Sequence, residues 1–304
     1  MEPVQPLPLV AFLGTGLMGY PMALRLLQGG YPVRAWNRTR AKADRLSSYG
    51  AYVAETAADA VADAEIVITM LEAGPAVADA IEQAQSGLRP NTLFIDMSST
   101  RPSEAKQFNA LLLAAGSRFI DAPVSGGVLG AQAGTLAIMA GASPADFADA
   151  EPLLKMLGKP TLVGPVGSGQ VAKLCNQLIV GGTLNIVAEA LLLAQAGGAD
   201  PAAVRTALRG GFADSRILEV HGQRMLDRDF MPGGQVKSQT KDLDNVLDAA
   251  GKAGVTLPVA ELVTQNYRTL LERCPGADQS AILLALESMN SGQRLGSVPD
   301  QLPD

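Results

Sequence analysis

The sequence predicts a two-domain α/β protein, with a doubly wound, mostly parallel sheet at residues 1–165 and an all-α domain at residues 166–304. Three observations lead to this prediction. Short apolar runs alternate with helical segments through the first half. A cluster of glycine and proline residues then interrupts the pattern at residues 164–169. Beyond this cluster the strand-like runs disappear and helical patterns continue to about residue 290.

The apolar runs of the first half are predicted strands, and Ala-rich segments between most of them are predicted helices. The strands are expected at residues 9–13, 33–36, 66–70, 93–96, 119–121, 136–139 and 161–163, and the helices at residues 21–27, 41–48, 76–84 and 103–114. Strands that alternate with helices form βαβ units, whose helices cover both faces of a parallel sheet.

A single long helix over about residues 168–197 is predicted to join the two domains. At 1.5 Å per residue such a helix is about 45 Å long, enough to cross from one domain into the other. Further helices are expected at residues 201–208, 215–226, 241–253, 258–271 and 278–289. The segment after Ser291 is rich in Gly, Pro and Asp, and it is predicted to fray.

The composition excludes several classes of partner. The chain has 304 residues, of which 47% are hydrophobic and 18% charged, as in a soluble globular protein. Its net charge of -6 disfavours binding to nucleic acid or to an anionic membrane surface. The most apolar stretch, residues 171–196, contains too many polar residues for a bilayer-spanning helix. Only Cys175, His221 and Cys274 offer thiol or imidazole ligands, so no zinc site is expected.

The two cysteines lie far apart in the sequence and do not form a disulfide framework. We interpret them as thiols in a reducing compartment. The N-terminal residues Met1 to Pro6 have no basic region ahead of an apolar stretch, and so do not resemble a secretory signal. The expected location is therefore the cytoplasm.

A dinucleotide-binding motif follows the first predicted strand. Gly14, Thr15, Gly16, Leu17, Met18 and Gly19 form the pattern G-x-G-x-x-G between a strand and a helix. Its first glycine permits a tight turn, the second lets the backbone approach a pyrophosphate, and the third permits close helix packing. The alternative is a purely structural glycine turn. The βαβ continuation favours a Rossmann-type dinucleotide-binding domain.

The end of the second strand bears on which nicotinamide dinucleotide is bound. An acidic residue here would bind the ribose 2′-hydroxyl of NAD, whereas an arginine accommodates the 2′-phosphate of NADP. The sequence reads Asn37, Arg38, Thr39, Arg40, without a carboxylate. Because a guanidinium makes strong charge-assisted contacts with phosphate, NADP is the preferred cofactor, with NAD the alternative. The alternative interpretation is that Arg38 and Arg40 are solvated charges at the start of a helix.

A dehydrogenase also needs a group that exchanges a proton with the reacting oxygen. No tyrosine is followed by lysine four residues later, which excludes the tyrosine–lysine mechanism. His221 has no neighbouring catalytic motif, and we interpret it as a surface or packing residue. Lys173 lies early in the long helix, with Asn176 and Gln177 three and four residues on. From the spacing alone, Lys173 is either functional or a lysine whose ammonium reaches water.

Four segments resemble the β-hydroxyacid dehydrogenase family, which includes 3-hydroxyisobutyrate dehydrogenases and semialdehyde reductases. They are Phe12–Ala23, Asp121–Gly127, Gly167–Asn176 and Lys241–Leu243, and together they span most of the chain. Within the family, the sequences of three further segments are most similar to those of tartronate semialdehyde reductases. These segments are residues 176–180, 208–211 and 225–230.

The resemblance implies a role for each matching residue. Lys173 would be the catalytic acid and base, with Asn176 and Gln177 beside the substrate. The turn of Ser125, Gly126 and Gly127 would bind the substrate carboxylate, since successive backbone N–H groups and a hydroxyl form a small anion site. The remaining positions, on loops at the carboxyl ends of strands or in the second lysine motif, would lie by the cofactor or substrate: Met70, Leu71, Thr100 and Lys241.

The expected activity is therefore the NADPH-dependent reduction of a small aldehyde acid: tartronate semialdehyde, glyoxylate or succinic semialdehyde. A 3-hydroxyisobutyrate dehydrogenase is the alternative, and a non-catalytic NADP-binding module or an imine reductase is more distant. Glu72 and Gly234 depart from the family pattern, which commonly has a proline at the first position and an aromatic residue near the second. We expect these departures to affect the choice of substrate more than the chemistry. The apolar helical domain is expected to form a homodimer or homotetramer.

Overall fold

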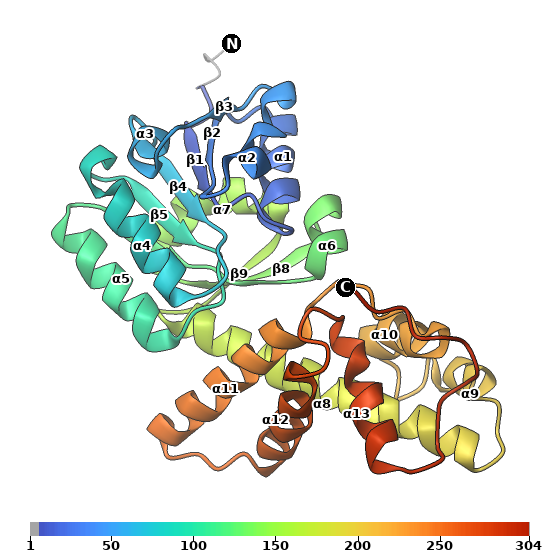
Figure 1. Ribbon diagram of the computed structural model, residues 1–304. Helices are drawn as coiled ribbons and strands as arrows, with labels where there is room; N and C mark the ends of the chain where they lie inside the picture. The colour runs from blue at the N-terminus through green and yellow to red at the C-terminus, as the bar shows by residue number, and fades with distance from the viewer. Residues whose placement is uncertain (1–5, 304) are drawn as a thin grey trace. The chain divides into compact units, whose positions relative to one another are not determined.

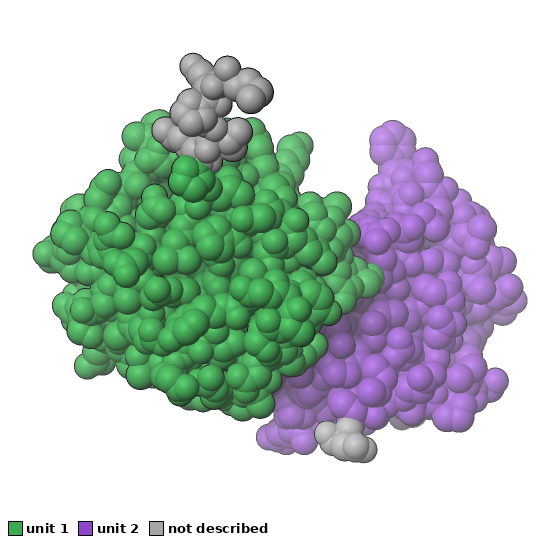
Figure 2. Space-filling model, turned by 90° about the horizontal axis from the view of Figure 1, so that it is seen from above, with its two compact units in different colours: residues 1–173 green, residues 174–304 purple. Residues whose placement is uncertain are grey.

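The computed structural model describes residues 6–303 and divides the chain into two compact units (Figures 1 and 2). The first unit is Met1–Lys173 and the second is Leu174–Asp304. The expectation about a secretory signal concerns residues that lie mostly outside the described part of the chain. Each unit is considered by itself below.

A mixed sheet forms the centre of the first unit (Figure 1). The order of its strands is β3-β2-β1-β4-β5-β6-β8-β7, and β9 pairs with β8. Strands β1 to β6 pair in parallel, whereas β8 runs antiparallel to β6 and β7. The strands are β1 (Val10–Leu13), β2 (Val33–Trp36), β3 (Tyr52–Val53), β4 (Ile66–Thr69), β5 (Leu93–Asp96), β6 (Arg118–Asp121), β7 (Val124–Ser125), β8 (Leu136–Gly141) and β9 (Gly158–Gly164).

Both faces of this sheet are buried, as expected for parallel strands covered by helices. In β1, Val10 and Phe12 point into one apolar core, whereas Ala11 and Leu13 point into the other. The first core is covered by α1 (Gly19–Gln28), α2 (Arg40–Asp44), α6 (Gly127–Ala133) and α7 (Pro144–Leu157). The second is covered by α3 (Ala57–Val61), α4 (Gly74–Ala84) and α5 (Pro102–Ala114). The predicted doubly wound domain is therefore confirmed.

The long helix α8 (Ser168–Ala196) begins in the first unit and continues into the second. By length and composition alone, it is the one helix within residues 6–303 long and apolar enough to cross a membrane, which differs from the expectation drawn from its polar residues. Core helices that do not cross a membrane meet the same criteria, and 44% of its most apolar stretch is buried. One of its faces, with Leu184, Val187 and Leu191, packs into the core of the second unit. The buried amides of Asn185 and Asn266 are hydrogen-bonded to each other beside this core. The helix predicted at residues 168–197 is confirmed.

Within residues 174–303, the regular elements of the second unit are helices, apart from isolated bridges. Its helices are α9 (Pro201–Leu208), α10 (Arg216–Asp227), α11 (Val236–Ala253), α12 (Pro258–Leu271) and α13 (Ile282–Met289). The sequence explains why several of these helices begin where they do. Proline occupies the first position of α9 and α12, where its missing N–H costs nothing. The side chains of Asp200 and Ser215 accept backbone N–H groups in the first turns of α9 and α10.

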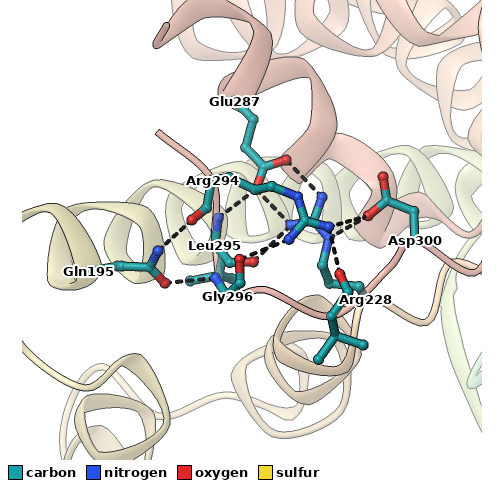
Figure 3. Close-up of polar contacts among 8 residues, drawn as sticks. Gln195, Arg228, Glu287, Arg294, Leu295, Gly296 and Asp300 are labelled. Carbon is teal, nitrogen blue, oxygen red and sulfur yellow. Dashed lines mark hydrogen bonds and ion pairs between the residues drawn. The ribbon is translucent and has the colours of Figure 1, made fainter. Parts of the chain in front are cut away.

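The prediction that the tail frays after Ser291 is wrong, because a buried arginine anchors it (Figure 3). Arg228 is 1% exposed and pairs through both terminal nitrogens with Glu287, at 2.7 and 2.8 Å. The same guanidinium contacts the Asp300 carboxylate and donates to the carbonyl oxygen of Leu295. A buried charge must be paired, so these partners fix the last turns of the chain against α10 and α13.

Several short elements were not predicted. Strands β3 and β7 have two residues each, too few for a periodic pattern, and α3 and α6 have five and seven. The helix predicted at residues 41–48 divides into α2 and a 3-10 turn at Ser47–Tyr49. The helix predicted from residue 241 begins at Val236, a turn and a half earlier. Helix boundaries are the least certain part of a sequence pattern.

Candidate active site

The glycine motif forms the turn between β1 and α1. Gly14 has φ +103°, and a Cβ there would lie 2.4 Å from the carbonyl oxygen of Met70. A Cβ on Gly19 would lie 1.9 Å from the carbonyl oxygen of Gly14. The two outer glycines are therefore required by close backbone packing, as the motif predicts.

The middle glycine faces open space. A Cβ on Gly16 would meet no heavy atom within 4 Å. The buried hydroxyls of Thr15 and Thr100 have no hydrogen-bond partner within residues 6–303. Open space beside the motif and unpartnered hydroxyls on the strand-end loops are what a bound dinucleotide would require. These residues of the first unit thus fit the cofactor that the motif implies.

Asn37 and Arg38 have different surroundings at the end of β2. The Asn37 side chain accepts a hydrogen bond from the N–H of Thr15 and donates one to the carbonyl oxygen of Thr39, both at 3.0 Å. Asn37 therefore supports the glycine turn. Arg40 pairs with Asp44 and Glu55, at 3.3 and 2.6 Å. Arg38 is exposed, and within residues 6–303 its guanidinium has no carboxylate partner.

Two strand-end loops meet beside this turn. The Ser98 hydroxyl, in the loop after β5, accepts the N–H of Leu71, in the loop after β4, at 2.9 Å. The N–H of Thr100 donates to the side-chain oxygen of Gln170 at 3.0 Å. The predicted residues Met70, Leu71 and Thr100 thus lie on loops joined to each other and to α8. Ser98 and Gln170, which join them, were not predicted.

Beneath these loops lies a fully buried carboxyl group. Oδ1 of Asp96 accepts hydrogen bonds from the Thr69 hydroxyl and the Ser98 N–H, at 2.8 and 3.0 Å. Its Oδ2 has no partner within residues 6–303. Burial raises the pKa of Asp96 to about 6, although the hydrogen bonds from Ser98 and Thr69 favour the ionised form.

Asp121 holds the start of α8. Its Oδ1 accepts the N–H of Gly167 at 2.7 Å and its Oδ2 accepts the N–H of Gln170 at 2.8 Å. Burial raises the pKa of Asp121 to about 7, against the effect of these two hydrogen bonds. Lys173 follows Gln170 by three residues on the same helix, and it is 8% exposed. A lysine this buried is uncommon without a specific role or partner.

The turn predicted to bind the substrate carboxylate joins β7 to α6. Gly126 and Gly127 have φ values of +136° and +62°, which favour glycine, and both are exposed. Ser125 is half-buried beside them. The backbone conformation accounts for both glycines, and the role of this turn in binding an anion stays a prediction.

In the second unit, a buried polar network joins α8 to α11. The Asn176 amide donates to the side-chain oxygen of Gln177 at 2.8 Å. Gln177 donates in turn to Gln239 and to the carboxylate of Asp242, at 2.9 and 2.8 Å. The ammonium of Lys241 lies 3.3 Å from the same carboxylate. Three predicted residues are therefore brought together, through Gln239 and Asp242, which were not predicted as site residues.

His221 belongs to a structural cluster rather than to this network. It lies 3.3 Å from the fully buried Asp278, whose other oxygen accepts the N–H groups of Gly233 and Gly234. Burial opposes ionisation of Asp278, but the contacts with His221 and Ser280 prevail and lower its pKa to about 2. The N–H of Gly234, one of the two positions at which the chain was expected to depart from its family, is thus bound by a buried carboxylate.

Comparisons with known proteins agree with this architecture. Residues 9–184 match the NAD binding domain of 6-phosphogluconate dehydrogenase, and residues 167–286 match the NAD-binding domain of NADP-dependent 3-hydroxyisobutyrate dehydrogenase. The chain is 40% identical to the 2-hydroxy-3-oxopropionate reductase of Escherichia coli, over 92% of this chain and 97% of that protein.

Two solved structures are similar over nearly their whole length. The 3-hydroxyisobutyrate dehydrogenase of Mycobacterium tuberculosis with L-serine has a TM-score of 0.84 and 31% identity, over 92% of this chain and 99% of that one. Psf3 in complex with NADP+ and 2-OPP also has a TM-score of 0.84, with 26% identity, over 91% and 99%. The chain therefore belongs to the β-hydroxyacid dehydrogenase family. It is an NAD(P)-dependent oxidoreductase, and the E. coli and M. tuberculosis relatives named above are reductases or dehydrogenases of small hydroxy or oxo acids.

Two glycine variants test the dinucleotide turn. We expect Gly16→Ala to change the free energy of unfolding by less than about 1 kcal/mol, because its Cβ meets nothing within 4 Å. The same methyl group would occupy the approach to the pyrophosphate and weaken NADPH binding about tenfold or more. Gly19→Ala is the contrasting variant and should lose about 1–3 kcal/mol of stability through overpacking. Urea unfolding and NADPH fluorescence titration measure both effects. Unchanged NADPH affinity in Gly16→Ala would contradict this assignment.

Asp96→Asn tests the buried carboxyl group. Because the folded-state pKa of Asp96 is above its ordinary value, the folded state binds more protons between about pH 4 and 6, and stability falls as the pH rises through that window. The variant should reduce this slope by up to about 1.4 kcal/mol per pH unit. Asp121 remains and keeps its own contribution. Urea unfolding at several pH values measures the slope, and an unchanged slope would show that Asp96 does not titrate there.

Proposed function

We propose that the protein reduces a small aldehyde acid to the corresponding hydroxy acid with NADPH, and that tartronate semialdehyde, which gives glycerate, is the preferred substrate. Glyoxylate and succinic semialdehyde are the closest other candidates. The observation that carries the proposal is the burial of Lys173 near the start of α8. This part of the helix is hydrogen-bonded to Thr100, in the loop after β5, and to Asp121, at the end of β6. The 40% identity to the E. coli reductase supports the choice of substrate.

Lys173 would supply the proton in this reaction. A bound nicotinamide dinucleotide supplies the hydride that adds to the carbonyl carbon. As negative charge develops on the carbonyl oxygen, the Lys173 ammonium would stabilise it and donate its proton, which completes the alcohol. In the oxidation direction the neutral amine would accept that proton. The Ser125–Gly127 turn would bind the substrate carboxylate, and Asn176 would contact the substrate.

The surroundings of the arginines after β2 support NADP over NAD. Arg38 is exposed and has no carboxylate partner in the described chain, whereas Arg40 is already paired with Asp44 and Glu55. A 2′-phosphate would therefore find its guanidinium partner in Arg38. The match of residues 167–286 to a domain of an NADP-dependent enzyme agrees with this preference.

The second candidate is a 3-hydroxyisobutyrate dehydrogenase. It is favoured by the structural similarity to the M. tuberculosis enzyme, at a TM-score of 0.84. NADPH oxidation with tartronate semialdehyde, glyoxylate, succinic semialdehyde and methylmalonate semialdehyde, repeated with NADH, distinguishes the candidates. A higher kcat/KM for methylmalonate semialdehyde would replace the first proposal by the second.

We also propose that the protein is a cytoplasmic homodimer or homotetramer. Cys175 and Cys274 are both free, which is consistent with a reducing compartment. The exposed face of α8 carries Ile179, Ile186 and Leu193, each more than 60% exposed, and such an apolar row supports self-association. Sedimentation velocity measures the oligomeric state, and a monomer at micromolar concentration would contradict the proposal.

Lys173→Met removes the proposed acid. We expect kcat to fall about 100-fold or more, because general acid catalysis typically contributes that much. NADPH affinity should change less than about threefold, since the cofactor turn lies elsewhere in the unit. Lys155→Met, at an exposed lysine of α7, is the control and should retain full turnover. Near-normal turnover in Lys173→Met would refute the assignment of Lys173.

Arg38→Ala tests the cofactor preference. Loss of a charge-assisted hydrogen bond should raise the KM for NADPH about tenfold or more and leave the KM for NADH almost unchanged. The control Arg40→Ala removes a guanidinium that is already paired with two carboxylates, and it should affect NADPH little. Steady-state kinetics with both cofactors measures the effect. The assignment fails if Arg40→Ala, rather than Arg38→Ala, selectively impairs the use of NADPH.

A further inference from the structure

Gln170 lies in the first turn of α8, the helix that carries Lys173, and its side chain reaches the loop that follows β5. Its side chain is fully buried. The amide nitrogen donates to the carbonyl oxygen of Ser98 at 2.8 Å, and the amide oxygen accepts the N–H of Thr100 at 3.0 Å. One planar group therefore pairs with two backbone groups of the loop that follows β5.

The backbone of the same residue is held from the other side. The Gln170 N–H donates to Asp121 at the end of β6. Close packing also fixes this turn, because a Cβ on Gly169 would lie 2.4 Å from the carbonyl oxygen of Met139 and 2.5 Å from that of Asp121. The first turn of α8 is thus fixed against β6 and β8, and the Gln170 side chain extends this fixed geometry to the loop after β5.

Lys173 follows Gln170 by one turn of helix. Residues three apart lie on neighbouring parts of a helix surface, so the position of Gln170 largely determines that of Lys173. Ser98 in turn binds the N–H of Leu71 in the next loop. A continuous series of hydrogen bonds therefore runs from the loop after β4, through the loop after β5, to the helix turn that carries the ammonium.

We propose that Gln170 is a positioning residue for the reaction: its two side-chain hydrogen bonds hold Lys173 in register with the loop that contains Thr100, so that both face the same reacting atoms. This inference rests on the proposed function, since it takes Lys173 as the proton donor. A small displacement of a catalytic group lowers the rate of the chemical step far more than it lowers binding. Gln170 should therefore act on kcat rather than on KM.

The second unit provides a matched control. Gln195, also on α8, makes the same pair of contacts: its amide nitrogen donates to the carbonyl oxygen of Arg294, and its amide oxygen accepts the N–H of Gly296 at 2.7 Å (Figure 3). In both cases one glutamine pairs with the C=O of one residue and the N–H of the residue two positions later. Gln195 anchors the C-terminal tail and has no part in the proposed site.

The experiment compares Gln170→Met with Gln195→Met in the full chain. Methionine keeps the length of the side chain and removes both hydrogen bonds. We expect Gln170→Met to lower kcat at least tenfold, to change the KM for NADPH less than threefold, and to increase the primary deuterium isotope effect on kcat because hydride transfer becomes slower. Gln195→Met should lower the melting temperature comparably and leave kcat within twofold. Amide hydrogen exchange at Thr100 should accelerate only in Gln170→Met.

Gln170→Glu adds a readout that a purely structural role would not give. When protonated, the new carboxyl group donates to the Ser98 carbonyl oxygen and accepts from Thr100, as the amide does. When ionised, it places a negative oxygen against that carbonyl. The kcat of Gln170→Glu relative to wild type should therefore recover as the pH falls, while the Gln195→Met ratio stays flat.

The outcomes separate this inference from the function on which it rests. If wild-type protein reduces an aldehyde acid but Gln170→Met retains its kcat, or loses no more than Gln195→Met, the positioning role is refuted alone. If the wild-type protein reduces none of the four semialdehydes or oxo acids, the proposed function fails and the inference with it.

Discussion

The two hydrogen bonds that the Asp121 carboxylate accepts fix the direction in which α8 leaves the sheet. Lys173 lies one turn further along this helix, and Asn176 and Gln177 follow in the second unit. The first N–H groups of a helix have no partners within the helix. Here the side chain of Asp121, at the end of β6, accepts the N–H groups of Gly167 and Gln170. The carboxyl group is fully buried, and this burial raises its pKa to about 7, while the two N–H donors offset part of the cost of desolvation. The geometry of the candidate site begins with this contact.

The sequence predicts most of the fold because its strongest signals are local. The run of β1, the glycine motif and the amphipathic start of α1 occur within twenty residues, and each favours the same βαβ unit. The 29-residue α8 also follows from its continuous apolar pattern. In contrast, the tail carries a composition typical of frayed ends, and its order depends on tertiary contacts such as the one between Arg228 and Asp300. That partner lies 72 residues away in the sequence, and no local pattern indicates it.

The candidate site also contains some residues that the sequence predicts and others that it does not. Motif positions such as Lys173 and Ser125 are visible in the sequence because the family pattern includes them, and their roles stay predictions. The residues that support them are not visible. Gln170 and Ser98 are ordinary polar residues whose importance arises from backbone groups of distant segments. The two arginines after β2 look equivalent in sequence, yet the structure pairs Arg40 with carboxylates and leaves Arg38 exposed. Such differences depend on tertiary contacts, which a single sequence does not encode in any local pattern.

The buried arginine of the second unit also bears on the order in which the protein folds during synthesis. Arg228 lies near the middle of the unit, but its carboxylate partners are Glu287 and Asp300, 59 and 72 residues later. Until those residues leave the ribosome, the guanidinium has no partner and cannot be buried without a large cost. The first unit has all its strands by residue 164 and is free to fold while the rest is still being made. The second unit cannot bury Arg228 with both carboxylates until residues 287 and 300 have been made, so products truncated before residue 287 should contain a folded first unit and an unfolded remainder.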